Sequence, residues 1–317
     1  MSNSLPTPYT APMRLTQAIL PVAGLGTRFL PWTKVIPKEL LPLGTQPMIA
    51  LLVDECLSAG ITDICFVISH GKELIPQYFA KNTALEALLA QRGKADALRE
   101  LGRYASVRFT TVYQEEQLGD GHAVLQAHEW VQSDPVAVLF GDDLIVGAES
   151  GLAQMARAYG GLPGGAVLLC LEDVPHERVR KYGIVAVDSA RPAGRLRRVT
   201  GLVEKPEPDA APSTLGIVGK YLIPRSTFGV LTKIVEEVGS PAFAQASHSA
   251  GSRSGLEPSE PRAGQAAGKE IRLVDAFLRQ LPDTPIYGYE AEGKRIDTGT
   301  PEGYREAVRN EEIPYFL

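Results

Sequence analysis

Short apolar runs alternate with helix-like segments along the first half of the chain, and this alternation constrains the fold more than any other feature. The apolar runs occupy residues 18–24, 63–69 and 135–143, and residues 107–114 alternate between apolar and polar. All four segments have the length and composition of a strand. Segments with helical patterns separate them, at 47–60, 84–101 and 122–131. Strands linked by helices pair in parallel, with the helices covering both faces of the sheet. We therefore predict an α/β fold, a three-layer α/β/α sandwich around a mixed, mostly parallel sheet.

The second half is less regular but still predicts ordered elements. These are a strand at 164–172, a hairpin of 182–188 with 197–206, a strand at 213–224, a helix at 270–281, a strand pair within 285–300 and a last helix at 301–310. Between residues 239 and 269, 21 of 31 residues are Ala, Gly, Ser or Pro, which predicts a disordered loop. Residues 1–16 predict a flexible lead.

Composition excludes several classes of function. Lys and Arg number 32 against 37 Asp and Glu, so the net charge of −5 argues against binding to nucleic acid or to an anionic membrane. No apolar run approaches the roughly 20 residues that span a bilayer, and the first residues do not resemble a signal peptide. Cys56, Cys65 and Cys170 lie in apolar contexts, which favours reduced core thiols and a cytoplasmic protein.

The segment GLGTRFLPWTKVIPKELLP, at 24–42, follows the first apolar run and carries the strongest functional signal. It is not a Walker A loop, because the string G-x-x-x-x-G-K-[ST] is absent. It is not a complete dinucleotide fingerprint, because Phe29 replaces the third glycine. A structural turn would explain the glycines alone.

The cations of this segment favour a phosphate-binding loop over a structural turn. Arg28, Lys34 and Lys38 precede the first acid, Glu39. Glycine allows backbone N–H groups to approach phosphate oxygens, and ligands of open α/β sheets bind at the carboxyl ends of the strands. We therefore expect a small anionic ligand here.

This segment resembles the motif G-x-G-T-R-x-x-P-x-T-K-x-x-P-K-E-x-x-P of nucleotide-sugar pyrophosphorylases. The form TKVIPKE is most similar to that of the bacterial UTP–glucose-1-phosphate uridylyltransferases. The resemblance continues over about residues 16–310, through QEEQLGDGHAVLQA, FGDD, YGIV, VEKP, IVGKY, EIRLVDA and IDTGTPEGY. It implies a Rossmann-like nucleotide-diphospho-sugar transferase fold in one domain, 17–310. The nucleotide-binding half would be about 17–145 and the sugar-binding half about 146–310.

The reaction implied by the resemblance joins UTP and α-D-glucose 1-phosphate into UDP-glucose and releases pyrophosphate, with Mg²⁺ as cofactor. The attacking sugar-phosphate oxygen is already anionic, so the reaction needs positioning and charge neutralisation more than a strong base. The resemblance assigns Arg28 and Lys38 to the reacting phosphates. It assigns Asp142 to the metal and Asp297 to the metal or a phosphate. Mg²⁺ prefers one or two carboxylates together with phosphate oxygens.

The remaining site residues are also assigned by the resemblance. Those implied to bind the nucleotide are Ala23, Gly24, Gly26, Gln114 and Gly119. Those implied to bind the sugar phosphate are Gly183, Glu204, Lys205 and Gly219. The amide of Gln114 would read the uracil edge, and Glu204 would accept hydrogen bonds from glucose hydroxyls. A homodimer or homotetramer is expected on resemblance alone.

Some residues depart from the family pattern and leave alternatives open. Asp120 stands where the family commonly has an apolar residue, and Asp143 is interpreted as a solvated or supporting acid. His122 favours a structural role. One alternative is the same fold acting on another nucleotide, such as dTTP, or on another sugar. The other is a catalytically silent regulatory relative, but such a protein should have lost one of the residues Arg28, Lys38, Asp142 and Lys205, which are all present.

Overall fold

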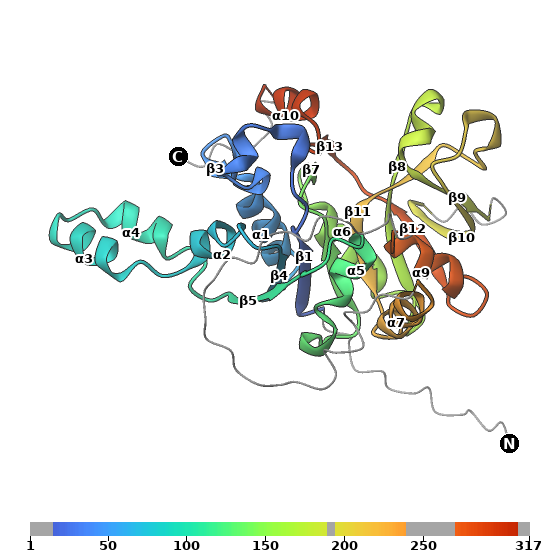
Figure 1. Ribbon diagram of the computed structural model, residues 1–317, viewed down its shortest axis with the longest axis horizontal. Helices are drawn as coiled ribbons and strands as arrows, with labels where there is room; N and C mark the ends of the chain where they lie inside the picture. The colour runs from blue at the N-terminus through green and yellow to red at the C-terminus, as the bar shows by residue number, and fades with distance from the viewer. Residues whose placement is uncertain (1–14, 189–193, 239–269, 310–317) are drawn as a thin grey trace, which may run out of the picture.

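The computed structural model describes residues 15–188, 194–238 and 270–309, and its centre is a nine-stranded sheet (Figure 1). In spatial order the strands are β5 (Arg108–Tyr113), β4 (Asp63–Ile68), β1 (Gln17–Pro21), β6 (Val136–Leu139), β11 (Leu215–Ile223), β8 (Val167–Asp173), β12 (Ile286–Glu290), β10 (Leu196–Glu204) and β9 (Gly183–Val187). The predicted disordered loop at 239–269 lies outside the described residues, as does the predicted lead apart from residues 15 and 16.

Two strands, β11 and β10, run opposite to the other strands of this sheet. β11 pairs antiparallel with both β6 and β8, whereas β4, β1 and β6 are parallel neighbours. β10 forms the predicted hairpin with β9, in a register that places Glu204 opposite Gly183. The sheet is therefore mixed and mostly parallel, as the sequence predicts.

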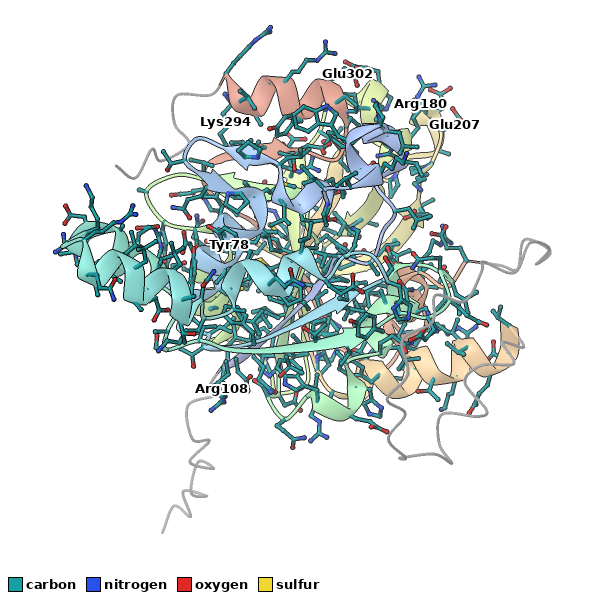
Figure 2. The ribbon with its side chains drawn as sticks, turned by 60° about the vertical axis from the view of Figure 1, so that its left-hand side comes forward. Tyr78, Arg108, Arg180, Glu207, Lys294 and Glu302 are labelled. Atoms are coloured by element: carbon teal, nitrogen blue, oxygen red, sulfur yellow. The ribbon has the colours of Figure 1, made fainter. Side chains whose placement is uncertain are left out.

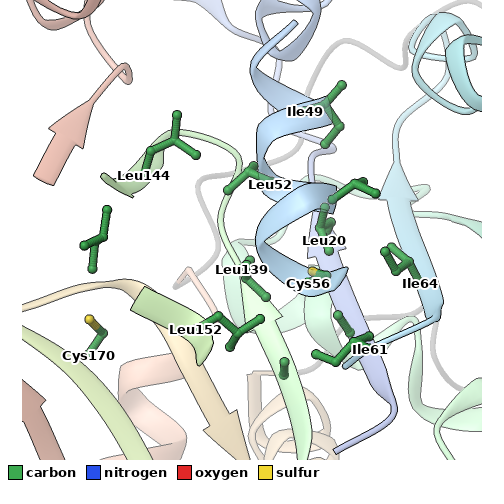
Figure 3. Close-up of a cluster of buried hydrophobic side chains, with 14 of the residues drawn as sticks. Leu20, Ile49, Leu52, Cys56, Ile61, Ile64, Leu139, Leu144, Leu152 and Cys170 are labelled. Atoms are coloured by element: carbon green, nitrogen blue, oxygen red, sulfur yellow. The ribbon is translucent and has the colours of Figure 1, made fainter. Parts of the chain in front are cut away.

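Helices cover both faces of the sheet, which confirms the three-layer sandwich. On one face lie α1 (Met48–Ser58) and α6 (Gly151–Tyr159), and on the other lie α5 (Asp120–Leu125), α7 (Ser226–Val238) and α9 (Leu273–Gln280). The side chains of each central strand alternate between the two cores. Leu20 of β1 packs under α1 beside Cys56 and Ile64, as Figure 3 shows, whereas its neighbour Ile19 faces the other core. The three cysteines are buried and unpaired.

The predicted helix over 84–101 is interrupted. It consists of α3 (Thr83–Gln91) and α4 (Ala95–Leu101), which meet at Gly93 with a φ of 66°. Neither helix has a buried residue, and the pair extends away from the sheet (Figure 1). The predicted helix at 122–131 is also shorter, because α5 ends at Leu125 and only the 3₁₀ turn η4 (His128–Trp130) follows.

The expected strand pair within 285–300 is wrong, although both strands exist. β12 joins the large sheet beside β8, while β13 (Lys294–Asp297) pairs with β7 (Asp143–Val146) in a separate two-stranded sheet. The segment between the two strands ends at Gly293, whose φ of 123° favours glycine. This pairing sets Asp297 opposite Asp143, next to Asp142.

Smaller elements complete the described chain. They are α2 (Leu74–Phe79), α10 (Pro301–Val308), the ribbon of β2 (Pro42–Leu43) with β3 (Gln46–Pro47), and the 3₁₀ turns η1 (Thr27–Phe29), η2 (Trp32–Lys34), η3 (Lys38–Leu40), η5 (His176–Lys181) and η6 (Pro208–Ala210). α10 matches the predicted final helix. Among the helices of the described residues, none has the length and apolar character to cross a bilayer.

Candidate active site

The glycine loop, residues 24–42, leaves the carboxyl end of β1 as three successive 3₁₀ turns. Its prolines and glycines prevent a regular helix, and Gly26 has a φ of 66°, which favours glycine. The hydroxyl of Thr33 donates a hydrogen bond to the carbonyl of Gly26 at 2.9 Å. This bond folds the loop back on itself.

The C-terminal part of the chain fastens the same loop. Arg28 Nη1 donates to the carbonyl oxygen of Gly299 at 3.2 Å, and Tyr304 of α10 donates its hydroxyl hydrogen to the carbonyl of Pro42 at 2.8 Å. The rings of Phe29 and Tyr304 meet edge to face, with centroids 6.1 Å apart. The loop therefore contacts α10 at both of its ends.

Two cavities open at this edge of the sheet. The smaller one, about 280 Å³, is lined by the end of β1, by Lys38 and by the segment from Gln114 to Asp120. The larger one, about 600 Å³, is lined by residues from β9, β10, β11, η5 and β13. Asp120, Phe140 and Asp142 line both cavities, so a single elongated ligand can occupy both.

The smaller cavity contains the residues expected to hold the nucleotide, except one. Ala23, Gly24, Gln114 and Gly119 line it, whereas Gly26 lies outside both cavities and serves the turn described above. Gln114 is 3% exposed, and its Nε2 lies 3.0 Å from the carbonyl of Gly119 and 3.1 Å from Nδ1 of His122. His122 therefore orients the amide, in agreement with a structural role.

Gly119 occupies a position that accepts glycine alone. Its φ is 116°, and a Cβ atom there would lie 2.4 Å from the carbonyl oxygen of Ile271. The segment before α9 packs closely because Ile271 N donates to Leu118 O at 2.7 Å and Gly121 N donates to Ile271 O at 3.0 Å. The backbone at Gly119 is thus fixed where the cavity begins.

The larger cavity contains all four residues expected to hold the sugar phosphate: Gly183, Glu204, Lys205 and Gly219. Glu204 is close to two cations, with its Oε1 3.5 Å from both Lys205 Nζ and Arg272 Nη1. Lys205 has a φ of 47°, and among the described non-glycine residues it alone has a positive φ. Such a conformation costs about 1–3 kcal/mol and is typical of functional positions.

The outer wall of this cavity is basic. Arg178 and Lys181 of η5 line it, and neither belongs to an ion pair within the described chain. η5 packs against η6, and Figure 2 shows the flanking residues Arg180 and Glu207 on the outer surface of this part.

A cation and two acids meet where the cavities join. Lys38 Nζ lies 2.9 Å from Asp142 Oδ2. Burial lowers the pKa of Lys38, but the carboxylates of Asp142 and Glu39 outweigh burial and hold this pKa above its usual value. Burial raises the pKa of Asp142, and Lys38 with Arg295 reverses this, so the pKa of Asp142 falls below its usual value. Both groups therefore stay charged at neutral pH.

Asp142 and Asp297 converge on Gly299. A Cβ atom on Gly299 would lie 2.9 Å from Asp142 Oδ2 and 3.1 Å from Asp297 Oδ1. Asp297 Oδ1 also accepts a hydrogen bond from Gly299 N at 2.9 Å. In the described residues no group of three or more His, Cys, Asp and Glu is arranged to hold a metal. Asp142 and Asp297, the two acids that the resemblance assigns to the metal, therefore lie together as a pair.

Asp143 lies beside this pair, opposite Asp297 in the pairing of β7 with β13, and it belongs to a network around Arg295. Asp143 Oδ1 accepts from Arg295 Nε at 2.6 Å, and its Oδ2 accepts from Gly219 N at 2.9 Å. Arg295 Nη1 also donates to Glu172 at 2.8 Å and to the hydroxyl of Tyr182 at 3.0 Å. Asp143 is thus a supporting acid that fixes β11 beside the cavity.

The family model described as nucleotidyl transferase matches residues 17–312. The chain belongs to the nucleotidyl transferase family. A UTP–glucose-1-phosphate uridylyltransferase of Komagataeibacter xylinus is 35% identical over 288 residues, which cover 90% of each chain.

Solved members of the nucleotidyl transferase family have the same fold. A structure described as UTP-bound UGPase from Acinetobacter baumannii is 34% identical, covers 93% of this chain and 92% of its own, and superposes with a TM-score of 0.77. A UDP-glucose pyrophosphorylase complexed with UDP-glucose is 29% identical over 93% of this chain and 97% of its own, with a TM-score of 0.73. The predicted nucleotide-diphospho-sugar transferase fold and the family resemblance are confirmed.

Several lining residues of this nucleotidyl transferase are not predicted by its sequence. They are Gln117, Phe140, Arg178, Lys181, Tyr182, Tyr221, Glu270, Arg272, Arg295 and Thr300. Arg272 and Arg295 reach the site through tertiary contacts with acids that are distant in sequence. Two of these residues have a signal in the sequence. Tyr182 lies next to Gly183, and Arg295 lies two residues before Asp297. Lys34, considered for phosphate binding, lines neither cavity.

Proposed function

We propose that this protein joins UTP and α-D-glucose 1-phosphate into UDP-glucose and releases pyrophosphate. The observation that carries the proposal is the junction of the two cavities. The smaller cavity has a fixed amide, Gln114, for a base edge, and the larger cavity has Glu204 and Lys205 for a sugar phosphate. Asp142, paired with Lys38, lies between the two cavities. Relatives described as UTP–glucose-1-phosphate uridylyltransferases, 33–35% identical over about nine tenths of the chain, support the same reaction.

The chemistry that follows from this arrangement is an in-line displacement. A phosphate oxygen of glucose 1-phosphate attacks the α-phosphorus of UTP; the new P–O bond forms as the bond to the β-phosphate breaks, and the electron pair leaves with pyrophosphate. In this proposal Lys205 holds the sugar phosphate, while Lys38 and Arg28 neutralise the triphosphate. Two anions that repel one another in water are thus held together by fixed cations, which is the main contribution a protein makes to such a transfer.

We propose Mg²⁺ as the cofactor, held by Asp142 and Asp297. The two carboxylates converge on one point, and they suit a hard cation that keeps phosphate oxygens and waters as its other ligands. When bound, Mg²⁺ would neutralise phosphate charge during the transfer. Lys38 Nζ donates to Asp142 Oδ2 and so orients this carboxylate beside the triphosphate position.

One assay tests the function. Pyrophosphate release is measured over a matrix of UTP, dTTP and other nucleoside triphosphates against several sugar 1-phosphates, with and without Mg²⁺. We expect the highest kcat/KM for UTP with glucose 1-phosphate, and activity that depends on Mg²⁺. A maximum at another base or sugar would replace the proposed substrates, and nucleotide binding without turnover would identify a silent regulatory relative.

We propose further that the protein is a homodimer or homotetramer and works in the cytoplasm. Leu85 and Leu88 of α3 and Leu101 of α4 are exposed, on a helix pair without buried residues, which supports association of copies. The buried, unpaired thiols support a reducing compartment. Light scattering after size-exclusion chromatography measures the molar mass of the protein in solution. A monomer at micromolar concentration would contradict the proposed homodimer or homotetramer.

A further inference from the structure

A buried ion pair lies directly beneath the glycine loop. Glu39 is 1% exposed and Lys72 is 7% exposed. Lys72 Nζ donates hydrogen bonds to Glu39 Oε1 and Oε2, both at 3.0 Å, and to the carbonyl oxygen of Val22 at 2.6 Å. All three donor hydrogens of this ammonium therefore have an acceptor.

This pair touches the three segments that carry the reacting groups. Val22 precedes Ala23 at the end of β1, and Glu39 follows Lys38 in η3. The Glu39 side chain also passes under the end of β6, because a Cβ atom on Gly141 would lie 3.1 Å from Glu39 Cγ. Gly141 directly precedes Asp142. The pair is thus one residue away from Ala23, Lys38 and Asp142 at once.

A buried, fully hydrogen-bonded ion pair such as Lys72–Glu39 is not explained by stability alone. Desolvation of two buried charges offsets most of their attraction, and apolar residues of similar volume often replace such pairs without loss of stability. Hydrogen bonds to a carboxylate and a carbonyl, however, fix direction as well as distance. Hydrophobic contacts between the same three segments would hold them together without fixing the place of Lys38.

We propose that Lys72 and Glu39 are positioning residues that set Lys38 against Asp142. The proposal rests on the function proposed above, because Lys38 is the group whose place matters there. Neither residue needs to touch substrate: Lys72 acts through Glu39, and Glu39 acts through the backbone of η3. Small displacements of a reacting group cost about 10²-fold in rate, so the consequence lies in kcat.

The test compares Lys72→Met with the double variant Glu39→Gln/Lys72→Met and the wild type. In Lys72→Met we expect kcat to fall about 100-fold, the loss typical of a misplaced reacting group, while KM for UTP changes much less. The double variant removes the unpaired buried charge, so its urea midpoint should recover while its kcat stays low. Ile234→Ala, at a buried position of α7, is the matched control: it should lose stability but keep the wild-type kcat at temperatures where it is folded.

Each outcome decides the matter. Low kcat in both Lys72 variants and normal kcat in Ile234→Ala support the proposal, as does low kcat in the single variant Glu39→Gln if Lys72→Met does not fold. Recovery of kcat together with stability in the double variant would overturn it, because charge compensation would then be the whole role of the pair. If the wild type releases no pyrophosphate, the proposed function fails; if the wild type and Lys72→Met are equally active, the inference alone fails.

Discussion

Gly299 lies between the carboxylates of Asp142 and Asp297, and its own carbonyl accepts a hydrogen bond from Arg28. The residue is therefore in contact with both proposed metal ligands and one proposed phosphate ligand. No side chain fits there without moving a carboxylate, since a Cβ atom would approach Asp142 Oδ2 to 2.9 Å. Single atoms thus decide the geometry of this site.

Gly299→Ala should raise the Mg²⁺ concentration needed for half-maximal activity by about tenfold or more, in the range that disturbed metal sites show. The added methyl group separates the two carboxylates. The measurement is a titration of activity with Mg²⁺ at saturating substrates. Gly229→Ala in α7 is the control, because a Cβ atom there has no neighbour within 4 Å. Equal Mg²⁺ requirements in the two variants would contradict the assignment of Asp142 and Asp297.

Asp120 predicts a dependence of stability on pH. Asp120 is exposed at the cavities, but the protein around its carboxyl group displaces enough water to raise its pKa to about 6. The carboxylates of Glu270 and Glu204 add to this, although Leu273 N donates to Asp120 Oδ1. The folded protein therefore binds this proton more tightly than the unfolded chain, whose Asp has a pKa near 3.8. Protonation of Asp120 therefore stabilises the folded protein fully below pH 3.8, and this stabilisation is lost as the pH rises through about 6.

Asp120→Asn keeps the acceptor for Leu273 N and removes the charge. Its urea midpoint should exceed that of the wild type above pH 6, and the difference should shrink as pH falls towards 3.8. Unfolding is followed by circular dichroism without ligand, and the acidic end of the series is the internal control. A difference that stays constant over this range would show that Asp120 is ionised in the folded protein throughout.

Motif residues and supporting residues differ in how far sequence can predict them. Lys38, Asp142, Glu204 and Lys205 were placed near one another by a resemblance that depends on long fixed strings, and they line the two adjoining cavities. Lys72 carries no such string. It is recognisable only through Glu39, which the fold brings near it, so spacing along the chain does not reveal it. Arg295 has only the weaker signal of its place two residues before Asp297.

Strand β11 has a bulge that connects the sheet to the site. Its pairing with β8 shifts register between Val218 and Tyr221, and the extra residues are Gly219 and Lys220. Lys220 is fully buried, and its Nζ donates to Glu55 Oε2 at 2.7 Å and to the carbonyl of Asp143 at 2.8 Å. The bulge thus joins α1, β7 and β11 behind the larger cavity.

Lys220→Met should reduce the free energy of unfolding by about 3–5 kcal/mol, because it leaves the buried Glu55 carboxylate unpaired. Urea unfolding measures this loss. Adding Glu55→Gln should restore most of it, since the amide oxygen can still accept from Leu152 N. Arg279→Gln, which breaks an exposed pair with Glu237, should cost about 0–1 kcal/mol. Similar losses at both sites would mean that water reaches Lys220.

At the element scale, the sequence predicts the central strands better than the helices of the second half. Strands that are buried on both faces, such as the one predicted at 164–172, are easy to predict because they are continuous apolar runs in the sequence. α7 was not predicted because Thr227, Val230, Thr232, Ile234 and Val235 are β-branched, and Gly229 lies among them. These residues have low helix propensity, and burial against the sheet outweighs it. The pairing of β13 with β7 depends on tertiary contacts and has no local signal.

One sheet passes through the whole described molecule, and both cavities open along its edge. The predicted nucleotide half contributes β5, β4, β1 and β6 to this sheet, and the predicted sugar half contributes its other five strands. The division into halves remains a prediction about roles. Because the cavities share Asp120, Phe140 and Asp142, a ligand that fills both should stabilise the molecule as a unit.

UDP-glucose should therefore raise Tm more than an equal concentration of UMP and glucose 1-phosphate added together. A single joined molecule loses its translational freedom once on binding, whereas two separate molecules lose it twice. A ligand at 100 times its Kd stabilises the folded protein by about 2.7 kcal/mol. Differential scanning fluorimetry in Mg²⁺ measures the shift. An equal shift from the unjoined pair would show that the two cavities are not filled by one molecule.

The bonds from Tyr304 to Pro42 and from Arg28 to Gly299 also depend on the last part of the described chain to be synthesised. β5, β4, β1 and β6 are complete once the ribosome has made residue 139, but the glycine loop obtains these partners only when residues 299–304 emerge. A chain that ends before residue 299 therefore lacks both of the bonds that fasten its glycine loop.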